Sequence, residues 1–495
     1  MMKRLFIYFQ LLALTAAAFT ACTDNDEFST NPSRRLSFST DTVSMDTLFS
    51  SVPSSTRSFW VYNKSNYGLR LQQVRLEKGN QTGFRVNVDG TYLDNTTGSQ
   101  VAWLDVRKGD SIRVFVELTS KWNGGEEPQL VEDNLVFLLE SGTEQKVNLR
   151  AYSWDAKLCH HLIVSHDSVI VSPQPMVIYG GLRVDSGATL TIKAPTTLYF
   201  HADAGLDVYG RLVVQGNDGL GGSVVMRGDR TDRMFDYLPY DRVSGQWKGI
   251  RFHASSTGNT LYNLDLHSAT DGIVVDSAAY DSLHYRLAME NVTIHNCKGY
   301  GLAAYNANFW MANCQISNTL NDCLAVFGGS ALVLYTTLAQ FYPFDADRGA
   351  ALRFTNYVDD QPYPLHQMAC LNSLVTGYAD DVVMGDTKDS TTLFNYYFAN
   401  CLLRTPAIED SVQLKLFPGV LFESPKDTVQ GAAHFVLVDA NLQDYDFHLD
   451  SLSTARAKAQ PILQIYPYNN DRDGNPRGDL PDIGCYQYCP EIKSE

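Results

Sequence analysis

Residues 290–326 read ENVTIHNCKGYGLAAYNANFWMANCQISNTLNDCLAV, a stretch that contains two copies of one short unit. The copies begin at Glu290-Asn-Val-Thr-Ile and Ala312-Asn-Cys-Gln-Ile, so their asparagines, Asn291 and Asn313, are 22 residues apart. One unit of this length cannot enclose a core, whereas stacked units bury one face against their neighbours. The repeat therefore predicts an all-β fold, a parallel β-helix, and its length and leucine spacing exclude a propeller and a leucine-rich repeat.

The unit recurs on both sides of this stretch. Further copies are Tyr262-Asn-Leu-Asp-Leu, Leu371-Asn-Ser-Leu-Val, Ala399-Asn-Cys-Leu-Leu and the degenerate Tyr335-Thr-Thr-Leu-Ala. Stacking predicts one apolar column, formed by Leu264, Val292, Cys314 and Cys401, and one asparagine ladder, formed by Asn263, Asn291, Asn313, Asn372 and Asn400. Simple strand alternation turns the ladder outward, whereas a bend just before each strand turns it inward, and the sequence leaves both arrangements open.

Residues 36–156 have a different pattern. Short runs alternate apolar and polar residues, and turn sequences such as Asp89-Gly90 and Ser141-Gly142 separate them. Alternation with period two and regularly spaced turns is typical of a β-sandwich. The predicted strands are 58–63, 69–76, 84–88, 112–118, 135–139 and 147–152, and no cysteine pair joins them as in an antibody domain.

Several strings resemble one family of bacterial surface proteins. Residues 59–63, FWVYN, and 84–90, FRVNVDG, resemble immunoglobulin-like domains that precede β-helices in Gram-negative surface lipoproteins. Residues 182–192, LRVDSGATLTI, and 247–252, WKGIRF, resemble the opening coils of right-handed parallel β-helix lipoproteins. The tail, NDRDGNPR and PDIGCYQY, resembles the C-terminal anchor-type segment of such proteins, which usually has Ala where Cys485 stands. The resemblance implies a β-helix over 157–425, a cap or anchor-type segment over 426–495, and a surface location.

The N-terminus reads as an export signal. Residues 1–21 combine Lys3 and Arg4 with an apolar run too short to span a bilayer comfortably. Phe19-Thr-Ala-Cys22 resembles a bacterial lipobox with Phe in place of the leading aliphatic residue, so Cys22 is the predicted lipidation site; a plain secretory cut near Ala21 is the alternative. An acidic cluster opens the tether, residues 22–35, and such clusters are associated with export to the outer face of the cell. We expect a protein anchored by lipid in the outer membrane, at the cell surface.

Composition restricts the partners and cofactors. The chain of 495 residues has a formal net charge of -16, which opposes nucleic acid as a partner. The eight cysteines other than Cys22 are interpreted mainly as core thiols, with a bridge between Cys485 and Cys489 left open. No metal site or cofactor is predicted, and His160, His161 and His166 lack an accompanying carboxylate pattern. A calcium-binding loop that contains Asp471, Asp473 and Gly474 is left open as an alternative. Leu480 stands where an EF-hand has its Glu, so a polar turn is the preferred interpretation.

Four insertions that interrupt the repeat are the predicted location of a site, because a regular coil leaves little room for chemistry. They span residues 227–247, 276–286, 341–348 and 357–366, where aromatic rings lie beside carboxylates and arginines, a combination that suits sugar rings and hydroxyls. Packing of these loops on one another as a lateral cap is the alternative. The candidate binding residues are Arg230, Arg233, Tyr237, Tyr240, Trp247, Tyr285, Arg286, Tyr342, Asp345, Asp347 and Tyr363.

The sequence indicates function less directly than it indicates fold. The favoured prediction is a non-catalytic surface lipoprotein whose β-helix displays a lateral face for a carbohydrate or a protein partner. The alternative is a polysaccharide lyase or glycoside hydrolase acting on an acidic, plant or host glycan. Its catalytic candidates, chosen by residue type, are Asp360, Asp381, Arg230 and Arg348. The Gly-His-Gly and Arg-Ile-Lys strings of pectin-hydrolase β-helices are absent from the sequence.

Overall fold

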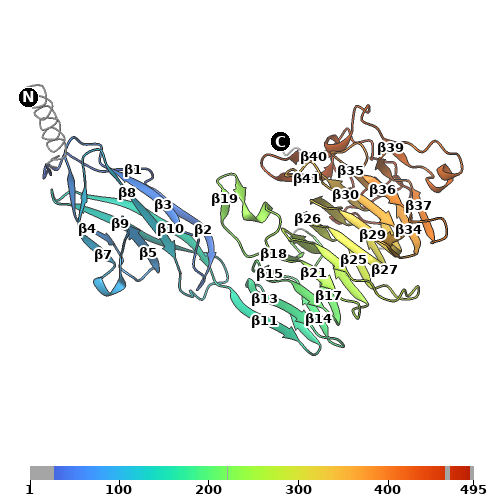
Figure 1. Cartoon of the computed structure of the whole chain (residues 1–495), viewed down its shortest axis with the longest axis horizontal. Helices are drawn as coiled ribbons and strands as arrows, with labels where there is room; N and C mark the ends of the chain where they lie inside the picture. The colour runs from blue at the N-terminus through green and yellow to red at the C-terminus, as the bar shows by residue number, and fades with distance from the viewer. Residues whose placement is uncertain (1–26, 220, 463–468, 491–495) are drawn as a thin grey trace, which may run out of the picture. The chain divides into compact units, whose positions relative to one another are not determined.

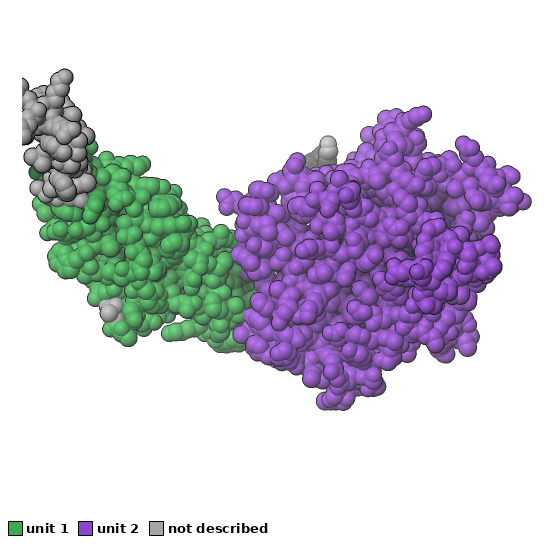
Figure 2. Space-filling model, in the orientation of Figure 1, with its two compact units in different colours: residues 1–155 green, residues 156–495 purple. Residues whose placement is uncertain are grey.

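The computed structural model describes residues 27–219, 221–462 and 469–490, so the predicted signal peptide and Cys22 lie outside the described residues. The chain divides into two compact units, Met1–Asp155 and Ala156–Glu495 (Figure 2). Both are built of strands, and the few helical segments are short 3-10 turns. No helix in the described part of the chain is long and apolar enough to cross a membrane.

The first unit consists of two five-stranded sheets. The first sheet has the order β1 (Ser37–Phe38), β3 (Arg57–Tyr62), β8 (Ser111–Leu118), β5 (Phe84–Val88) and β6 (Thr91–Tyr92). The second has the order β2 (Thr42–Phe49), β10 (Glu144–Trp154), β9 (Gln129–Leu139), β4 (Leu69–Leu76) and β7 (Gln100–Val106). The pairings are antiparallel except that of β2 with β10.

Alternation of buried and more exposed side chains along these strands produces the core of the first unit. In β5 the pattern runs from buried Phe84 through half-buried Arg85 to buried Val86. Side chains such as Val61, Leu71, Val114 and Phe137 join them in one buried cluster that both sheets share. All six predicted strands are present, whereas β1, β2, β6, β7 and the turn η1 (Asn95–Thr97) were not predicted.

The second unit is a right-handed parallel β-helix whose strands form one 25-stranded sheet, wound into three faces (Figure 1). Face 1 contains the first halves of β11 (Lys157–Val164) and β13 (Met176–Val184). It continues through β15 (Thr197–Phe200), β18 (Val224–Gly228), β23 (Leu264–His267), β26 (Thr293–Cys297), β28 (Gln315–Thr319), β30 (Thr337–Gln340), β35 (Leu374–Gly377), β38 (Leu402–Arg404) and β39 (Leu421–Glu423).

Faces 2 and 3 complete each coil. Face 2 holds the second halves of β11 and β13, then β16 (Leu206–Val208), β21 (Ile250–Phe252), β24 (Ile273–Val275), the first halves of β27 (Leu302–Ala312) and β29 (Leu324–Leu334), β31 (Leu352–Thr355) and β36 (Val383–Asp386). Face 3 holds β12 (Ser168–Ile170), β14 (Thr189–Lys193), β17 (Arg211–Gln215), β22 (Asn259–Tyr262), β25 (Leu287–Glu290), the second halves of β27 and β29, β34 (Leu365–Leu371) and β37 (Phe394–Ala399).

The repeat asparagines form the bends between face 3 and face 1. Asn263, Asn291, Asn313, Asn372 and Asn400 all have positive φ, between 51° and 55°. Asn tolerates this left-handed conformation better than most residues, which explains its recurrence at the bend. The amides of Asn313 and Asn372 donate to the backbone carbonyls of Asn470 and Gln460, which belong to the C-terminal segment outside the coils. These side chains therefore face outward.

The interior of the coils is mostly apolar, with a few buried and hydrogen-bonded polar side chains such as Thr336 and Ser373. Leu264, Val292, Cys314 and Cys401, the predicted column, are all fully buried in one core cluster. The eight cysteines among the described residues are free thiols, Cys485 buried and Cys489 exposed, so the Cys485 to Cys489 bridge left open by the sequence is not formed. The sulfur atoms of Cys370 and Cys401 are 3.9 Å apart without a bond.

The C-terminal segment packs along the outside of face 1. It contains η4 (Gly431–His434), β40 (Phe435–Asp439) and β41 (Asp444–Leu449), and η3 (Gln413–Leu416) precedes it. Phe435, Phe447 and Cys485 form a second apolar cluster with Tyr335 and Leu374 from the coils. This segment leaves only part of the outer side of face 1 open to solvent.

Candidate functional site

A pocket lies where the C-terminal segment stops covering face 1. Its volume is about 400 Å³, and it opens between β23 and β26, the 227–247 insertion and β41. Most of its lining is charged or polar: Asp241, Arg242, Asp265, His267, Thr293, His295, Asn296, Gln315, Gln443, Asp444, Tyr445, Asp446, Phe447, His448, Arg472 and Tyr486. A concave site with convergent polar groups is where binding or catalysis is first sought.

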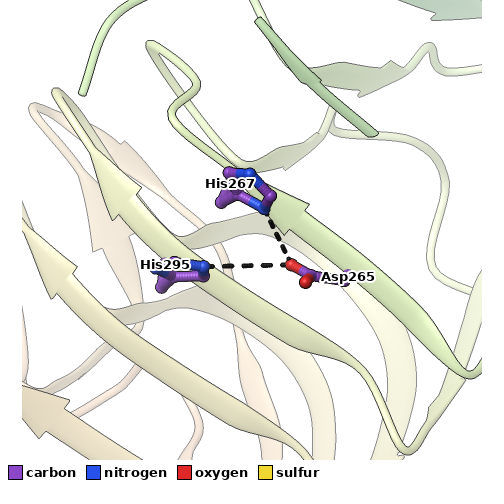
Figure 3. A group of neighbouring side chains, drawn as sticks. All are labelled: Asp265, His267 and His295. Atoms are coloured by element: carbon purple, nitrogen blue, oxygen red, sulfur yellow. Dashed lines mark hydrogen bonds and ion pairs between the residues drawn. The ribbon is translucent and has the colours of Figure 1, made fainter. Parts of the chain in front are cut away.

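Strand register brings the central residues of this pocket together. His267 of β23 is paired with His295 of β26, and their rings lie 4.9 Å apart between centroids. Side chains alternate along a strand, so Asp265 and His267 point outward from β23 while Leu266 between them is buried in the core. Figure 3 shows Asp265, His267 and His295 converging on one point of face 1.

His267 is held between two carboxylates. Its Nδ1 lies 2.9 Å from Asp265 Oδ1, and its Nε2 lies 2.8 Å from Asp241 Oδ1. Only 6% of His267 is exposed. An imidazole whose two nitrogens both face carboxylates donates with both, so it carries a positive charge.

The charges of the pocket shift several pKa values. Burial by itself lowers the pKa of His267, but attraction to Asp265 and hydrogen bonds to both carboxylates outweigh it and raise the pKa to about 9. Burial, together with repulsion from His267, lowers the pKa of the neighbouring His295 to about 4. At neutral pH the two neighbouring imidazoles therefore differ in charge. Burial opposes ionisation of Asp241 and Asp265, but hydrogen bonding and attraction to His267 hold the pKa of each below its ordinary value.

Asp241 reaches the pocket from the 227–247 insertion. The insertion contains the hairpin of β19 (Arg233–Phe235) and β20 (Leu238–Pro239), followed by η2 (Tyr240–Arg242). Arg227 anchors Asp241, with Nη1 2.6 Å from Oδ1, and Arg242 joins the insertion to the C-terminal segment, with Nη2 3.1 Å from Asp444 Oδ1. The insertion and the C-terminal segment thus form opposite walls.

A second charged histidine lies on the C-terminal wall. His448 Nδ1 is 2.5 Å from Asp446 Oδ1, and its Nε2 is 2.7 Å from Asp473 Oδ2. Burial lowers its pKa, but these two carboxylates raise it to about 9. Asp473 belongs to the stretch that the sequence left open as a calcium-binding loop. In that stretch, Asp471 accepts backbone N–H groups from Asp473, Asn475 and Gln487, which is the bonding of a polar turn.

Contacts join the four predicted insertions in pairs. Ser244 Oγ and Tyr342 Oη are 3.3 Å apart, which links residues 227–247 with 341–348. Tyr280 and His366 stack with centroids 3.9 Å apart, which links residues 276–286 with 357–366, where β32 (Tyr357–Val358) and β33 (Gln361–Pro362) form a small hairpin. The insertions therefore pack as two pairs.

Three of the predicted binding residues are buried and make structural contacts, so the prediction is wrong for them. Trp247 is fully buried, stacks on Phe200 at 4.4 Å and donates to the carbonyl of His267. Arg286 is 6% exposed and donates to backbone carbonyls, including those of Ser256 and His253. Tyr342 is also 6% exposed. Aromatic and basic side chains beside a repeat pack into its corners because their apolar parts gain from burial.

The remaining candidates lie on exposed loops. Arg230 pairs with Asp232 and covers the ring of Tyr240, Arg233 donates to the carbonyl of Asp236, and Tyr237 stacks on Phe235. Tyr285 is exposed, Tyr363 is half-buried, and Asp345 accepts the backbone N–H of Asp347.

The catalytic candidates do not converge. Asp360 is exposed with Lys388 Nζ 3.8 Å from it, Asp381 accepts the backbone N–H of Val383, and Arg348 donates to the carbonyl of Tyr342. None of Asp360, Asp381, Arg230 and Arg348 lines the pocket beside β23 and β26.

The pocket residues on face 1 were missed, although the sequence contains their signal. His267 and His295 each follow a repeat asparagine by four residues, after Asn263 and Asn291. Equal offsets in successive coils place side chains next to one another on the same face. The predicted site was placed on insertions and not on polar residues within the repeat itself. His448 and Arg472 carry no such signal.

Comparison with known proteins supports the fold. Residues 248–339 match the family model of the right-handed β-helix region. No curated protein matches the chain.

Among solved structures, the chain is similar to the catalytic unit of a thermostable GH87 α-1,3-glucanase from Streptomyces thermodiastaticus. This match has 14% identity and a TM-score of 0.22, and covers 74% of this chain and 88% of that one. The VesB protease of Vibrio cholerae matches with 15% identity, TM-score 0.16, over 24% of this chain and 32% of its own. A family 123 glycoside hydrolase from Clostridium perfringens matches with 6% identity, TM-score 0.17, over 24% of this chain and 26% of its own.

Proposed function

We propose that this protein is an exported, lipid-anchored surface protein that binds a carbohydrate in the pocket beside β23 and β26. The observation that carries the proposal is the pocket itself, about 400 Å³ in volume and lined by closely spaced donors and acceptors. Its size falls in the range of small-molecule sites, about 300 to 1,000 Å³.

The chemistry of the lining favours a sugar. Sugar hydroxyls both donate and accept, so they match a surface where carboxylates such as Asp446 alternate with donors such as Arg242 and amides such as Gln443. The net charge of -16 disfavours a polyanion held by charge alone. A neutral glycan, or one with few acidic groups near Arg242 and Arg472, is the expected ligand.

The N-terminal sequence supports export and anchoring. Lys3 and Arg4 followed by an apolar run are typical of a signal peptide, and the lipobox-like string ends at Cys22. At ~0.8 kcal/mol per buried methylene group, two or three acyl chains on Cys22 would hold the body of the protein on a membrane. The first unit then serves as a spacer between the membrane and the β-helix.

Glycan cleavage is a second candidate, because the neighbouring histidines His267 and His295 differ in charge. A lyase needs a base that removes a proton and a cation that stabilises the resulting anion, which are roles open to neutral His295 and charged His267. A hydrolase with two carboxylates fits less well. Such an enzyme needs one carboxyl group with a raised pKa, whereas the pKa values of Asp241 and Asp265 are both lowered.

A panel of plant, host and microbial polysaccharides tests both candidates. Soluble protein beginning near Ser29 is incubated with each polysaccharide, with and without Ca²⁺, while binding and new chain ends are measured. We expect binding of at least one glycan that His295→Gln or Arg242→Gln weakens at least tenfold. Asp281→Asn, in an exposed pair with His284 outside the pocket, should leave binding unchanged. New chain ends that disappear in His295→Gln would replace the binding function with cleavage, and no binding to any glycan would refute both.

A further inference from the structure

We propose that Asp265, His267 and His295 form a binding site for a divalent transition-metal ion, with Zn²⁺ as the best match. Two imidazoles and one carboxylate are a ligand set that Zn²⁺ accepts, with its fourth position left for water or another ligand. The sequence predicted no metal, because the three residues are divided between two coils and form no local motif.

The distances between the candidate ligand atoms fit a small ion. One nitrogen or oxygen from each of the three residues lies within 4.8 Å of the others. His267 Nδ1 is 2.9 Å from Asp265 Oδ1, and His295 Nε2 is 3.9 Å from the same oxygen (Figure 3). Zn–N and Zn–O bonds of about 2.0 to 2.2 Å at tetrahedral angles place ligand atoms roughly 3.4 Å apart. Side-chain movements on the order of 1 Å therefore suffice.

His267 already has the outer partner that metal-bound histidines need. Its Nε2 faces Asp241 Oδ1 at 2.8 Å, and Arg227 Nη1 holds the same oxygen at 2.6 Å. A carboxylate behind a metal-bound imidazole fixes the ring and makes it a stronger ligand. Nδ1 is then the nitrogen directed toward the ion, and the proton it shares with Asp265 is released to solvent when the ion binds.

His295 provides a second, independent observation in favour of a metal site. Among the described residues its ring makes no hydrogen bond, and its nearest ion partner is Asp265 at 3.9 Å. A structural ion pair between Asp265 and His267 does not require a second imidazole with an unused nitrogen at this position. Rigid strands of face 1 hold both histidines, which gives the precision that metal sites need.

The open pocket lies directly beside the three ligands, so a bound ion keeps a position accessible to water or to a ligand from solution. Arg472 also lines the pocket, with Nη1 3.8 Å from Asp473 Oδ1, and Asp265 attracts its charge as well. The inference goes beyond carbohydrate binding, because it concerns the ion alone and holds whether or not a glycan binds.

Titration of the purified full chain with Zn²⁺ alone, after treatment with a chelator, tests the proposal. We expect one saturable site per chain by calorimetry, and one equivalent of zinc retained after dialysis. Co²⁺ in place of Zn²⁺ should give the visible absorption of a tetrahedral or five-coordinate site. Absence of saturable binding by the native chain would overturn the proposal without reference to any variant.

Variants locate the site. His295→Gln should lower Zn²⁺ affinity at least a hundredfold, and Asp241→Asn should lower it about 10-fold to 100-fold, as expected for an outer partner. His284→Gln, the control, removes an exposed histidine that also has a carboxylate neighbour and should change nothing. Circular dichroism of each variant verifies folding. Equal affinity in His295→Gln and the native chain would show that Zn²⁺ binds elsewhere and would refute the assignment.

Discussion

The two ends of one row on the outside of face 1 carry the same kinds of residue in opposite surroundings. At one end His267 and His295 lie beside Asp265 and Asp241, and a pocket opens next to them. At the other end Arg404 and Glu423 are paired across β38 and β39, with His434 of η4 on top. The first group borders an open pocket, where Asp265 and His295 are half-buried, whereas the C-terminal segment closes over the second.

The closed end is fully satisfied. Glu423 accepts from Arg404, from His434 Nε2 at 2.8 Å and from the backbone N–H of Gly431 at 2.8 Å. The side chains of Arg404, Glu423 and His434 are 7%, 2% and 0% exposed. Residue type alone therefore does not distinguish a structural network from a candidate site. Access to solvent and unused bonding capacity do.

Substitution at the closed end should have the largest effect on stability. Glu423→Gln removes the buried charge beside Arg404 and leaves that guanidinium only the exposed carboxylate of Asp380, 3.1 Å away. Breaking a buried pair in this way costs about 3 to 5 kcal/mol. The free energy of unfolding, measured in urea, should fall by that amount while any glycan or metal binding of the folded protein persists. A loss below about 1 kcal/mol would remove the contrast between the two ends.

Substitution at the open end should cost less stability and more binding. Asp265 is half-buried, so Asp265→Asn leaves the charge of His267 with Asp241 and with solvent, and we expect a loss of about 1 to 3 kcal/mol. Zn²⁺ binding should fall at least tenfold in the same variant. If stability drops as far as in Glu423→Gln while binding is unchanged, the open end is structural too.

The pH dependence of stability sharpens the comparison through His448. Asp446 and Asp473 face its ring nitrogens, the tilted ring of Tyr486 lies with its centroid 4.0 Å away, and Arg472 is paired with Asp473. Its folded pKa of about 9 lies above the ordinary 6.5, so its contribution is full below pH 6.5 and lost as the pH rises to about 9.

The melting temperature should therefore fall between pH 6.5 and 9, and His448→Gln should make that fall shallower. Part of the slope remains, because the pKa of His267 is also raised to about 9. Identical slopes in the two proteins would show that His448 is not charged in the fold.

The smallest effect is expected outside both ends. Asp281 and His284 form an exposed pair at 2.8 Å, and such pairs contribute about 0 to 1 kcal/mol. Asp281→Asn should change the free energy of unfolding by less than about 0.5 kcal/mol and leave glycan and metal binding intact. A larger change would mean that the 276–286 insertion is more important to the fold than its exposure indicates.

The periodicity of the sequence allowed the fold to be predicted but did not indicate the site. The 22-residue spacing of Asn291 and Asn313 comes from a bend that repeats in six successive coils, so the repeat can be recognised without coordinates. Trp247 and Arg286 were selected by residue type, and burial reversed that interpretation. His448 is 153 residues from His295 in the sequence, and no local pattern connects the two.

By itself, the sequence determined the β-helix and the sandwich-like pattern of the first unit, because these follow from neighbours along the chain and from equal offsets between coils. Tertiary structure alone decided which outward residues of face 1 are covered. The C-terminal segment returns over the coils, closes on Glu423 and stops before His267 and His295. Burial and charge balance depend on such long-range packing. Chemically similar residues therefore form a structural network at one end of the row and line an open pocket at the other.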